Sequence, residues 1–174
     1  YLGGGPFVGS VVFGMSPKWV GIFFGAPAVG YFAGNWYTGR NAQRLGVNRL
    51  ILVGAIAVSS GTALMLAVFW LGFGSPSTFF GLMTIIGLGN GMVIPNATAG
   101  MLSVRPHLAG TASGLGGAIM IGGGACLASL AVFLLKPETG AYPLILIMMF
   151  TSMAAVVAIL AVYLREARLK LGRE

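Results

Sequence analysis

The polar side chains that could do chemistry in this chain are mostly uncharged and stand inside long apolar stretches. Asn90 and Asn96 lie six residues apart in one stretch, and Ser113 lies in another. A side-chain amide in an apolar environment needs a hydrogen-bond partner, which a neighbouring helix or a ligand in a cavity can supply. Both interpretations stay open for Asn90. Packing is favoured for Asn96, because Pro95 frees a backbone carbonyl beside it.

Aromatic and methionine side chains in the same stretches could line a cavity for apolar ligands, because they are polarizable and adapt to varied shapes. Plain packing or lipid contact is the alternative role for each of them. The predicted cavity residues are Tyr1, Phe7, Tyr31, Asn90, Met92, Asn96, Ser113 and Met120. They predict recognition of small, mainly apolar molecules.

Catalysis and metal binding have little support in the sequence. The chain contains no Asp, so a Ser-His-Asp set is impossible, and its three Glu stand outside the apolar stretches. The glycine run at 122–124 lacks the Lys-Ser or Lys-Thr step of a phosphate loop. His107 has no other ligand at metal-binding spacing, and Cys126 is a lone small apolar residue. We predict no catalytic residue, metal or cofactor, and a protein that is not an enzyme.

The elements that must position these residues are membrane spans. Hydrophobic residues make up 57% of the chain and charged residues 7%, and the mean hydropathy is +0.93. Such a chain has too little polar surface to fold as a water-soluble globule. Backbone groups in lipid must pair within their own segment, so an all-α polytopic membrane bundle is predicted. Its six transmembrane helices are expected near residues 1–14, 19–36, 50–73, 78–102, 109–135 and 142–164.

The first of these spans is shorter than the others. Residues 1–14 would rise only about 20 Å as a helix, and a span needs about 20 residues to cross roughly 30 Å of hydrocarbon. We interpret this stretch as the outer half of a truncated span whose upstream part is missing. The chain is therefore expected to be the C-terminal portion of a longer protein.

Basic residues mark alternate connections between the spans. Eight of the ten Lys and Arg follow the second, fourth and sixth spans, namely Arg40, Arg44, Arg49, Arg105, Arg165, Arg168, Lys170 and Arg173. The other connections hold only Lys18 and Lys136. Positive residues near span ends stay in the cytoplasm, so these three ends and the C-terminus are predicted to be cytoplasmic. The basic residues form no continuous face, so the charge of +7 does not predict nucleic-acid binding.

Glycine content differs between the spans and predicts which of them pack closely. The sixth span has no glycine and the third has few, so both are expected to face lipid around four tightly packed spans. Two sets of three spans, each ending in a lipid-facing helix, suggest a 3+3 repeat. Four glycine pairs have the GxxxG spacing that favours helix contact: Gly21/Gly25, Gly30/Gly34, Gly87/Gly91 and Gly110/Gly114.

A basic motif follows the second span. Gly39 and Arg40 are followed by Arg44, Gly46 and Arg49. This pattern resembles the cytoplasmic loop between helices 8 and 9 of the major facilitator superfamily. In that family an Asp usually stands where this chain has Gln43, so a charge-paired gate that depends on the Asp is not expected here.

Three further strings extend the resemblance over the whole chain. Residues 89–97 read Gly-Asn-Gly-Met-Val-Ile-Pro-Asn-Ala, and residues 105–114 read Arg-Pro-His-Leu-Ala-Gly-Thr-Ala-Ser-Gly. They are similar to helix 10 and the start of helix 11 in drug:proton antiporters of the bicyclomycin-resistance and chloramphenicol-efflux type. Residues 1–8 are similar to the end of helix 7 in that group. The chain thus resembles helices 7 to 12, the C-terminal half of such an antiporter.

The resemblance implies a secondary active transporter of the inner membrane that exports drugs by alternating access. The partners it implies are the lipid bilayer, a missing N-terminal six-helix half, a small-molecule substrate, and protons carried through that missing half. The first and fourth spans would line the cavity, and the second and fifth would form the interface between halves. Two alternatives stay open: a carrier of sugar, organic acid or siderophore, and a self-contained six-helix membrane protein that acts by dimerisation or partner binding.

Overall fold

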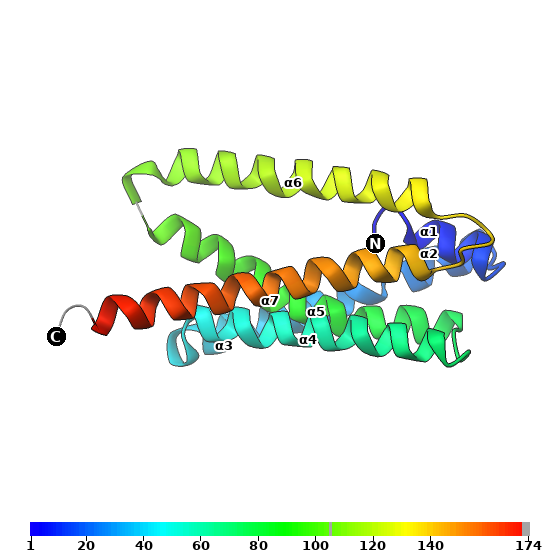
Figure 1. The fold of residues 1–174 in the computed structure, drawn as a ribbon, viewed down its shortest axis with the longest axis horizontal. Helices are drawn as coiled ribbons and strands as arrows, with labels where there is room; N and C mark the ends of the chain where they lie inside the picture. The colour runs from blue at the N-terminus through cyan, green and yellow to red at the C-terminus, as the bar shows by residue number, and fades with distance from the viewer. Residues whose placement is uncertain (105, 172–174) are drawn as a thin grey trace.

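The computed structural model describes residues 1–104 and 106–171, and the prediction of an all-α fold is confirmed for them. Arg105, Arg173 and Glu174 lie outside the described residues. The elements in chain order are α1 (Gly5–Phe7), the π-helical turn η1 (Val8–Val12), α2 (Pro17–Phe24), α3 (Ala26–Leu45), α4 (Val47–Trp70), α5 (Pro76–Ser103), the 3-10 turn η2 (Pro106–Leu108), α6 (Ala109–Leu134) and α7 (Tyr142–Leu171). Figure 1 shows α3, α4, α5 and α7 running side by side, with α6 apart from them.

Four segments of the described chain are long and apolar enough to cross a membrane: α4, α5, Pro106–Leu134 and Tyr142–Glu166. The predicted six spans are therefore matched in part. The helix α3 has 20 residues, but Asn35 near its middle and Arg40 and Arg44 in its second half lower its hydropathy. The first two helices, α1 and α2, have 3 and 8 residues.

The second predicted span, at 19–36, is divided into α2 and α3 at Gly25. The physical reason is Pro27, which has no backbone N–H to donate to the preceding turn and whose ring crowds the carbonyl four residues earlier. Proline is well tolerated in the first turn of a helix, so a new helix starts directly after the break. The helix α3 then continues to Leu45, nine residues beyond the predicted end.

The helix α5 packs against α3 through the glycines that the sequence singled out. Gly34 of α3 meets Gly91 of α5 directly, while Gly30 lies against the α5 backbone and Gly87 against the α3 backbone; all four are buried. A Cβ built on Gly30 would overlap the carbonyl oxygen of Thr84. Only hydrogen on these Cα atoms lets the two backbones touch, which is how small residues stabilise helix pairs in lipid. Both GxxxG pairs therefore form one helix interface.

The prediction that the third span faces lipid was wrong, and so was the prediction that the fifth is tightly packed. The third span is α4, which packs on α5 through Gly54 and also contacts α7. The fifth is α6, which is set apart in Figure 1 and has only 6% of its apolar segment buried. A Cβ on Gly110 or Gly114 would meet nothing within 4 Å. Glycine permits another helix to approach closely, but the sequence does not show which helix packs against a given glycine.

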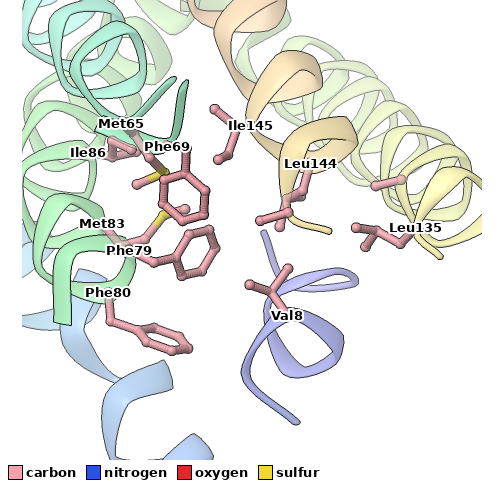
Figure 2. Packing of buried hydrophobic residues seen from close by; sticks show 12 residues of the cluster. Val8, Met65, Phe69, Phe79, Phe80, Met83, Ile86, Leu135, Leu144 and Ile145 are labelled. Carbon is pink, nitrogen blue, oxygen red and sulfur yellow. The ribbon is translucent and has the colours of Figure 1, made fainter. Parts of the chain in front are cut away.

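The hydrophobic core lies where α4, α5 and α7 meet η1, and Figure 2 shows its packing. Phe79 and Phe80 are fully buried, with ring centroids 5.1 Å apart in an edge-to-face arrangement. Phe69 meets Phe79 in the same way at 6.1 Å. Val8 and Leu144 close the cluster from η1 and α7. Edge-to-face aromatic pairs add to the packing energy, so this cluster holds one end of the bundle together.

The basic connections lie together at the other end of the molecule. The α3–α4 turn, the end of α5, the start of α6 and the end of α7 are on the left in Figure 1. The turns before α2, α5 and α7 are on the right. Lys18 lies in the first turn of α2, and Lys136 lies in the turn before α7. The chain therefore places one charge-rich end opposite one charge-poor end.

Candidate functional site

A cavity of about 350 Å³ lies between α4, α5 and α7 and reaches Tyr1 at the start of the chain. Its walls are mainly aliphatic and methionine side chains, with a minority of polar groups. The apolar lining residues are Pro27, Ala55, Val58, Met83, Ile86, Gly87, Val93, Met148 and Ala155. The polar lining residues are Tyr1, Thr62, Asn90, Thr151 and Ser152. Apolar walls with a few convergent polar groups are typical of sites for small molecules.

Tyr1 is held against the cavity by α2. Its hydroxyl donates a hydrogen bond of 2.9 Å to the carbonyl oxygen of Phe24, and its ring stacks on the Phe24 ring with centroids 4.8 Å apart. Phe24 is the last residue of α2, so the break at Gly25 leaves its carbonyl free to accept this bond. The position of Tyr1 in the cavity wall thus depends on the division of the second span after Phe24.

Asn90 and Asn96 have different environments, although both lie on α5. Asn96 is 3% exposed; its amide nitrogen donates to the Met92 carbonyl oxygen at 2.7 Å and to Thr38 Oγ1 at 3.4 Å. It therefore joins α5 to α3. Asn90 is half-buried and lines the cavity, and its side chain has no hydrogen-bond partner among the described residues. Of the two amides, only Asn90 can meet a ligand in this cavity.

The other predicted cavity residues are not gathered at this cavity. Phe7 is half-buried against the hydrophobic core, and Met92 is 3% exposed beside α4. Tyr31 is 38% exposed on α3. Ser113 and Met120 are exposed on α6. The cavity therefore contains Tyr1 and Asn90 from the predicted set.

Three hydroxyl residues of the cavity were missed by the sequence analysis. Thr62 of α4 and Ser152 of α7 are buried, with their oxygens 3.1 Å apart, and Thr151 lies beside them. Single Ser and Thr residues are common in apolar spans because they can bond to their own backbone. The sequence therefore carried no signal that these three belong to one site. Their juxtaposition depends on the contact between α4 and α7.

The predicted basic loop motif is mostly helical. Gly39, Arg40 and Arg44 lie on the last turns of α3, where basic side chains complement the helix dipole. Gly46 alone makes the turn to α4, with φ 81° and ψ 151°, a conformation open mainly to glycine. Arg49 lies in the first turn of α4. The loop prediction was wrong because a single glycine suffices to connect the two helices.

A second, larger cavity of about 1070 Å³ lies at the basic end, between α4, α5 and α7. Arg49 is part of its lining, as are Asn48 and Glu166, whose side chains are hydrogen-bonded at 2.7 Å. Val93 and Ala155 line both cavities, so the two are neighbours. Together they follow α5 and α7 from Tyr1 to the basic end.

No metal site is evident in the described part of the chain. Among those residues no group of three or more His, Cys, Asp or Glu side chains lies together. The arrangement can bind by hydrogen bonds and apolar contact, and it offers no nucleophile paired with a base.

Comparison with known proteins finds a similarity to multidrug resistance protein D of Escherichia coli (strain K12). The two sequences are 34% identical over 136 residues, which is 78% of this chain and 33% of that protein. The matched part thus spans about a third of the length of this relative. No family model matches the chain. No solved structure matches it either.

Proposed function

We propose that this chain is the C-terminal six-helix half of a major facilitator transporter, and that it exports drugs or other small apolar molecules. The observation that carries the proposal is the cavity that brings Asn90 of α5 and Tyr1 together inside a bundle of apolar helices. The partial similarity to a multidrug resistance protein, a transporter of this superfamily, supports it. A transporter needs a site within the membrane that holds its substrate only weakly, and uncharged polar groups in an apolar wall meet that need.

The mechanism we propose is alternating access, in which this bundle rocks against a second six-helix bundle around a midplane cavity. The exposed face of α6, with Ser113 and Met120, would meet that second bundle. Its poor burial among the described residues supports this assignment, because a largely unpacked apolar helix needs either lipid or another helix beside it. The substrate would lie in the cavity that Tyr1, α4, α5 and α7 line.

Coupling to protons is proposed to take place in the second bundle. The apolar stretches of this chain contain no acidic residue, since its Glu residues stand at 138, 166 and 174. A proton carrier in a transporter has to change charge near the substrate path. The half that this chain forms would therefore supply substrate contacts, and the second half would supply the titratable group.

The proposed location is the inner membrane, with six spans and a cytoplasmic C-terminus. The charge-rich end of the molecule contains Arg40, Arg44 and Arg49 around the α3–α4 turn. The end of α7 lies at the same end of the molecule. Retention of such residues in the cytoplasm favours this orientation. In this topology α2 and the first half of α3 form the second span, and α1 with η1 forms part of the first.

A self-contained membrane protein that acts by dimerisation is the second candidate. The observation that favours it is again α6, whose open glycines at 110 and 114 could receive a helix of another copy. Chemical crosslinking of the full-length gene product in native membranes distinguishes the two. A dominant dimer band of six-helix subunits supports assembly, whereas a monomer with further spans supports the transporter.

The transport experiment uses inside-out membrane vesicles that contain the full-length gene product. Respiration acidifies such vesicles and quenches the fluorescence of an acridine dye that accumulates in them. Drug:proton antiport would release protons when a transported drug is added, so fluorescence should recover within seconds. Vesicles without the protein serve as the control. No recovery with any drug of a broad neutral and cationic panel would contradict the proposal.

A further inference from the structure

The cavity between α4, α5 and α7 carries polar groups on three sides, and none of its lining residues has a side chain that is charged at neutral pH. Thr62 comes from α4, Asn90 from α5, and Thr151 and Ser152 from α7. An ionic ligand would lose its hydration here without meeting an opposite charge, which is costly in a site surrounded by lipid. The lining therefore favours uncharged ligands.

The hydroxyl protons of this lining already have acceptors within the protein. Thr151 Oγ1 and Ser152 Oγ each donate to a carbonyl oxygen in the preceding turn of α7, at 2.9 and 2.8 Å. Thr62 Oγ1 has two such carbonyl acceptors on α4, both at 3.0 Å. A hydroxyl has one proton and two lone pairs. Thr62 and Ser152 are buried with their oxygens 3.1 Å apart, so these two hydroxyls bond within the protein. Thr151 is exposed, and what its hydroxyl can still offer a ligand is a lone pair, so it acts as an acceptor.

Two further groups add hydrogen-bonding capacity that the protein does not use. The Asn90 amide has two N–H donors and a carbonyl acceptor, with no partner among the described residues. The Ser59 hydroxyl, one turn from Thr62, is buried and likewise has no partner among them. Ser59 is not part of the cavity lining, whereas Asn90 is, so the unused donors and acceptor of Asn90 are the ones that a ligand in the cavity can meet.

We propose that this cavity selects uncharged molecules that carry an O–H or N–H donor beside an apolar body. The donor would reach the hydroxyl oxygen of Thr151, and the Asn90 amide would pair with a carbonyl or hydroxyl elsewhere on the ligand. The apolar body would lie against Val58 and Met83. This inference rests on the proposed function, because it names the class of molecule that the transporter carries.

Two neutral compounds test this selectivity. Thiamphenicol and florfenicol have nearly the same size and differ at one position, where a hydroxyl group of thiamphenicol is replaced by fluorine in florfenicol. Binding to the purified full-length protein in detergent is measured by calorimetric titration. One extra hydrogen bond should make the dissociation constant of thiamphenicol about 2- to 10-fold lower than that of florfenicol.

A matched pair of variants assigns this preference to the cavity. Thr151→Val removes a cavity hydroxyl and keeps the side-chain shape. Thr98→Val removes an equally exposed hydroxyl that makes the same 2.9 Å bond to the carbonyl four residues earlier, but on α5 and outside the lining of both cavities. We expect Thr151→Val to reduce the ratio of the two dissociation constants toward one, and Thr98→Val to leave it unchanged.

Three results would overturn the inference: equal dissociation constants in the unmodified protein, the same change of ratio in both variants, or no binding of either compound. The proposed function fails separately. If thiamphenicol is preferred through Thr151 but no drug moves protons in the vesicles, the ligand preference stands and the transport proposal falls. If drugs move protons but the two compounds bind equally, the transport proposal stands and the inferred ligand preference falls.

Discussion

Gly54 of α4 and Gly89 of α5 lie backbone against backbone. A Cβ built on Gly54 would be 2.7 Å from the carbonyl oxygen of Gly89, and one built on Gly89 would be 2.6 Å from the carbonyl oxygen of Gly54. Real Cβ atoms do not approach a neighbour so closely, so a methyl group at either position must push the helices apart. Because lipid gives apolar helices no hydrophobic reason to associate, such contacts decide which helices pair.

Gly89→Ala should destabilise the bundle by about 1–3 kcal/mol, the usual cost of overpacking a close contact. The matched control is Gly81→Ala on the same helix, where a Cβ would meet nothing within 4 Å. Thermal unfolding of both variants in the same detergent measures the difference. A stability loss of equal size in the two variants would mean that glycine at these positions acts through helix propensity and not through the α4–α5 contact.

The two asparagines of α5 should respond differently to substitution. Asn90→Ala should change which drugs the full-length protein exports and leave its stability nearly intact, because the Asn90 amide lines the cavity without a protein partner among the described residues. Asn96→Ala should lower stability by about 0.5–2 kcal/mol, since it leaves a buried Thr38 hydroxyl without its donor.

Drug susceptibility of cells that express each variant, together with the melting temperature of each purified variant, checks this prediction. Equal loss of folded protein for both substitutions would assign both amides to packing. A change of drug range in Asn96→Ala at normal stability would place that residue, too, on the substrate path.

The sequence predicted the helices well because long uncharged stretches leave few alternatives in lipid. The run at 50–104 contains no charge, and the predicted break within it lies between α4 and α5, with the last two residues of the Gly-Phe-Gly-Ser-Pro-Ser string forming the start of α5. It did not predict the division at Gly25, where the effect of Pro27 competes with an otherwise apolar pattern. The local sequence thus determines where most helices lie, and Pro27 divides one predicted helix into two.

Packing between helices was harder to predict. The Gly30/Gly34 and Gly87/Gly91 pairs form an interface, whereas Gly110/Gly114 have the same spacing and face open space. A spacing motif states what a helix face can do, and tertiary structure decides whether a partner meets it. The same limit applies to the cavity, where Thr62 and Ser152 come from helices that are far apart in sequence.

The two glycines of the basic motif should differ in their tolerance of substitution. Gly46 has φ 81° and ψ 151°, so Gly46→Ala should cost about 1–3 kcal/mol in backbone strain. Gly39 lies within α3, where a Cβ would meet nothing within 4 Å, and Gly39→Ala should be neutral or stabilising by up to about 1 kcal/mol. Melting temperatures of the two variants test this. A larger loss in Gly39→Ala would contradict the described α3–α4 turn.

Residues 1–174 by themselves should not couple drug movement to protons. Their apolar stretches hold no carboxylate: Glu138 lies in the connection before α7, and Glu166 lies toward the basic end of α7, where it accepts a hydrogen bond from Asn48 outside the cavity that holds Asn90. The measurement is the dye assay on vesicles that contain this chain alone, with vesicles that contain the full-length gene product as the positive control. Drug-dependent proton release by the chain alone would place the coupling group in this bundle. The polar groups around Asn90 would then be the candidates for a proton path through this bundle.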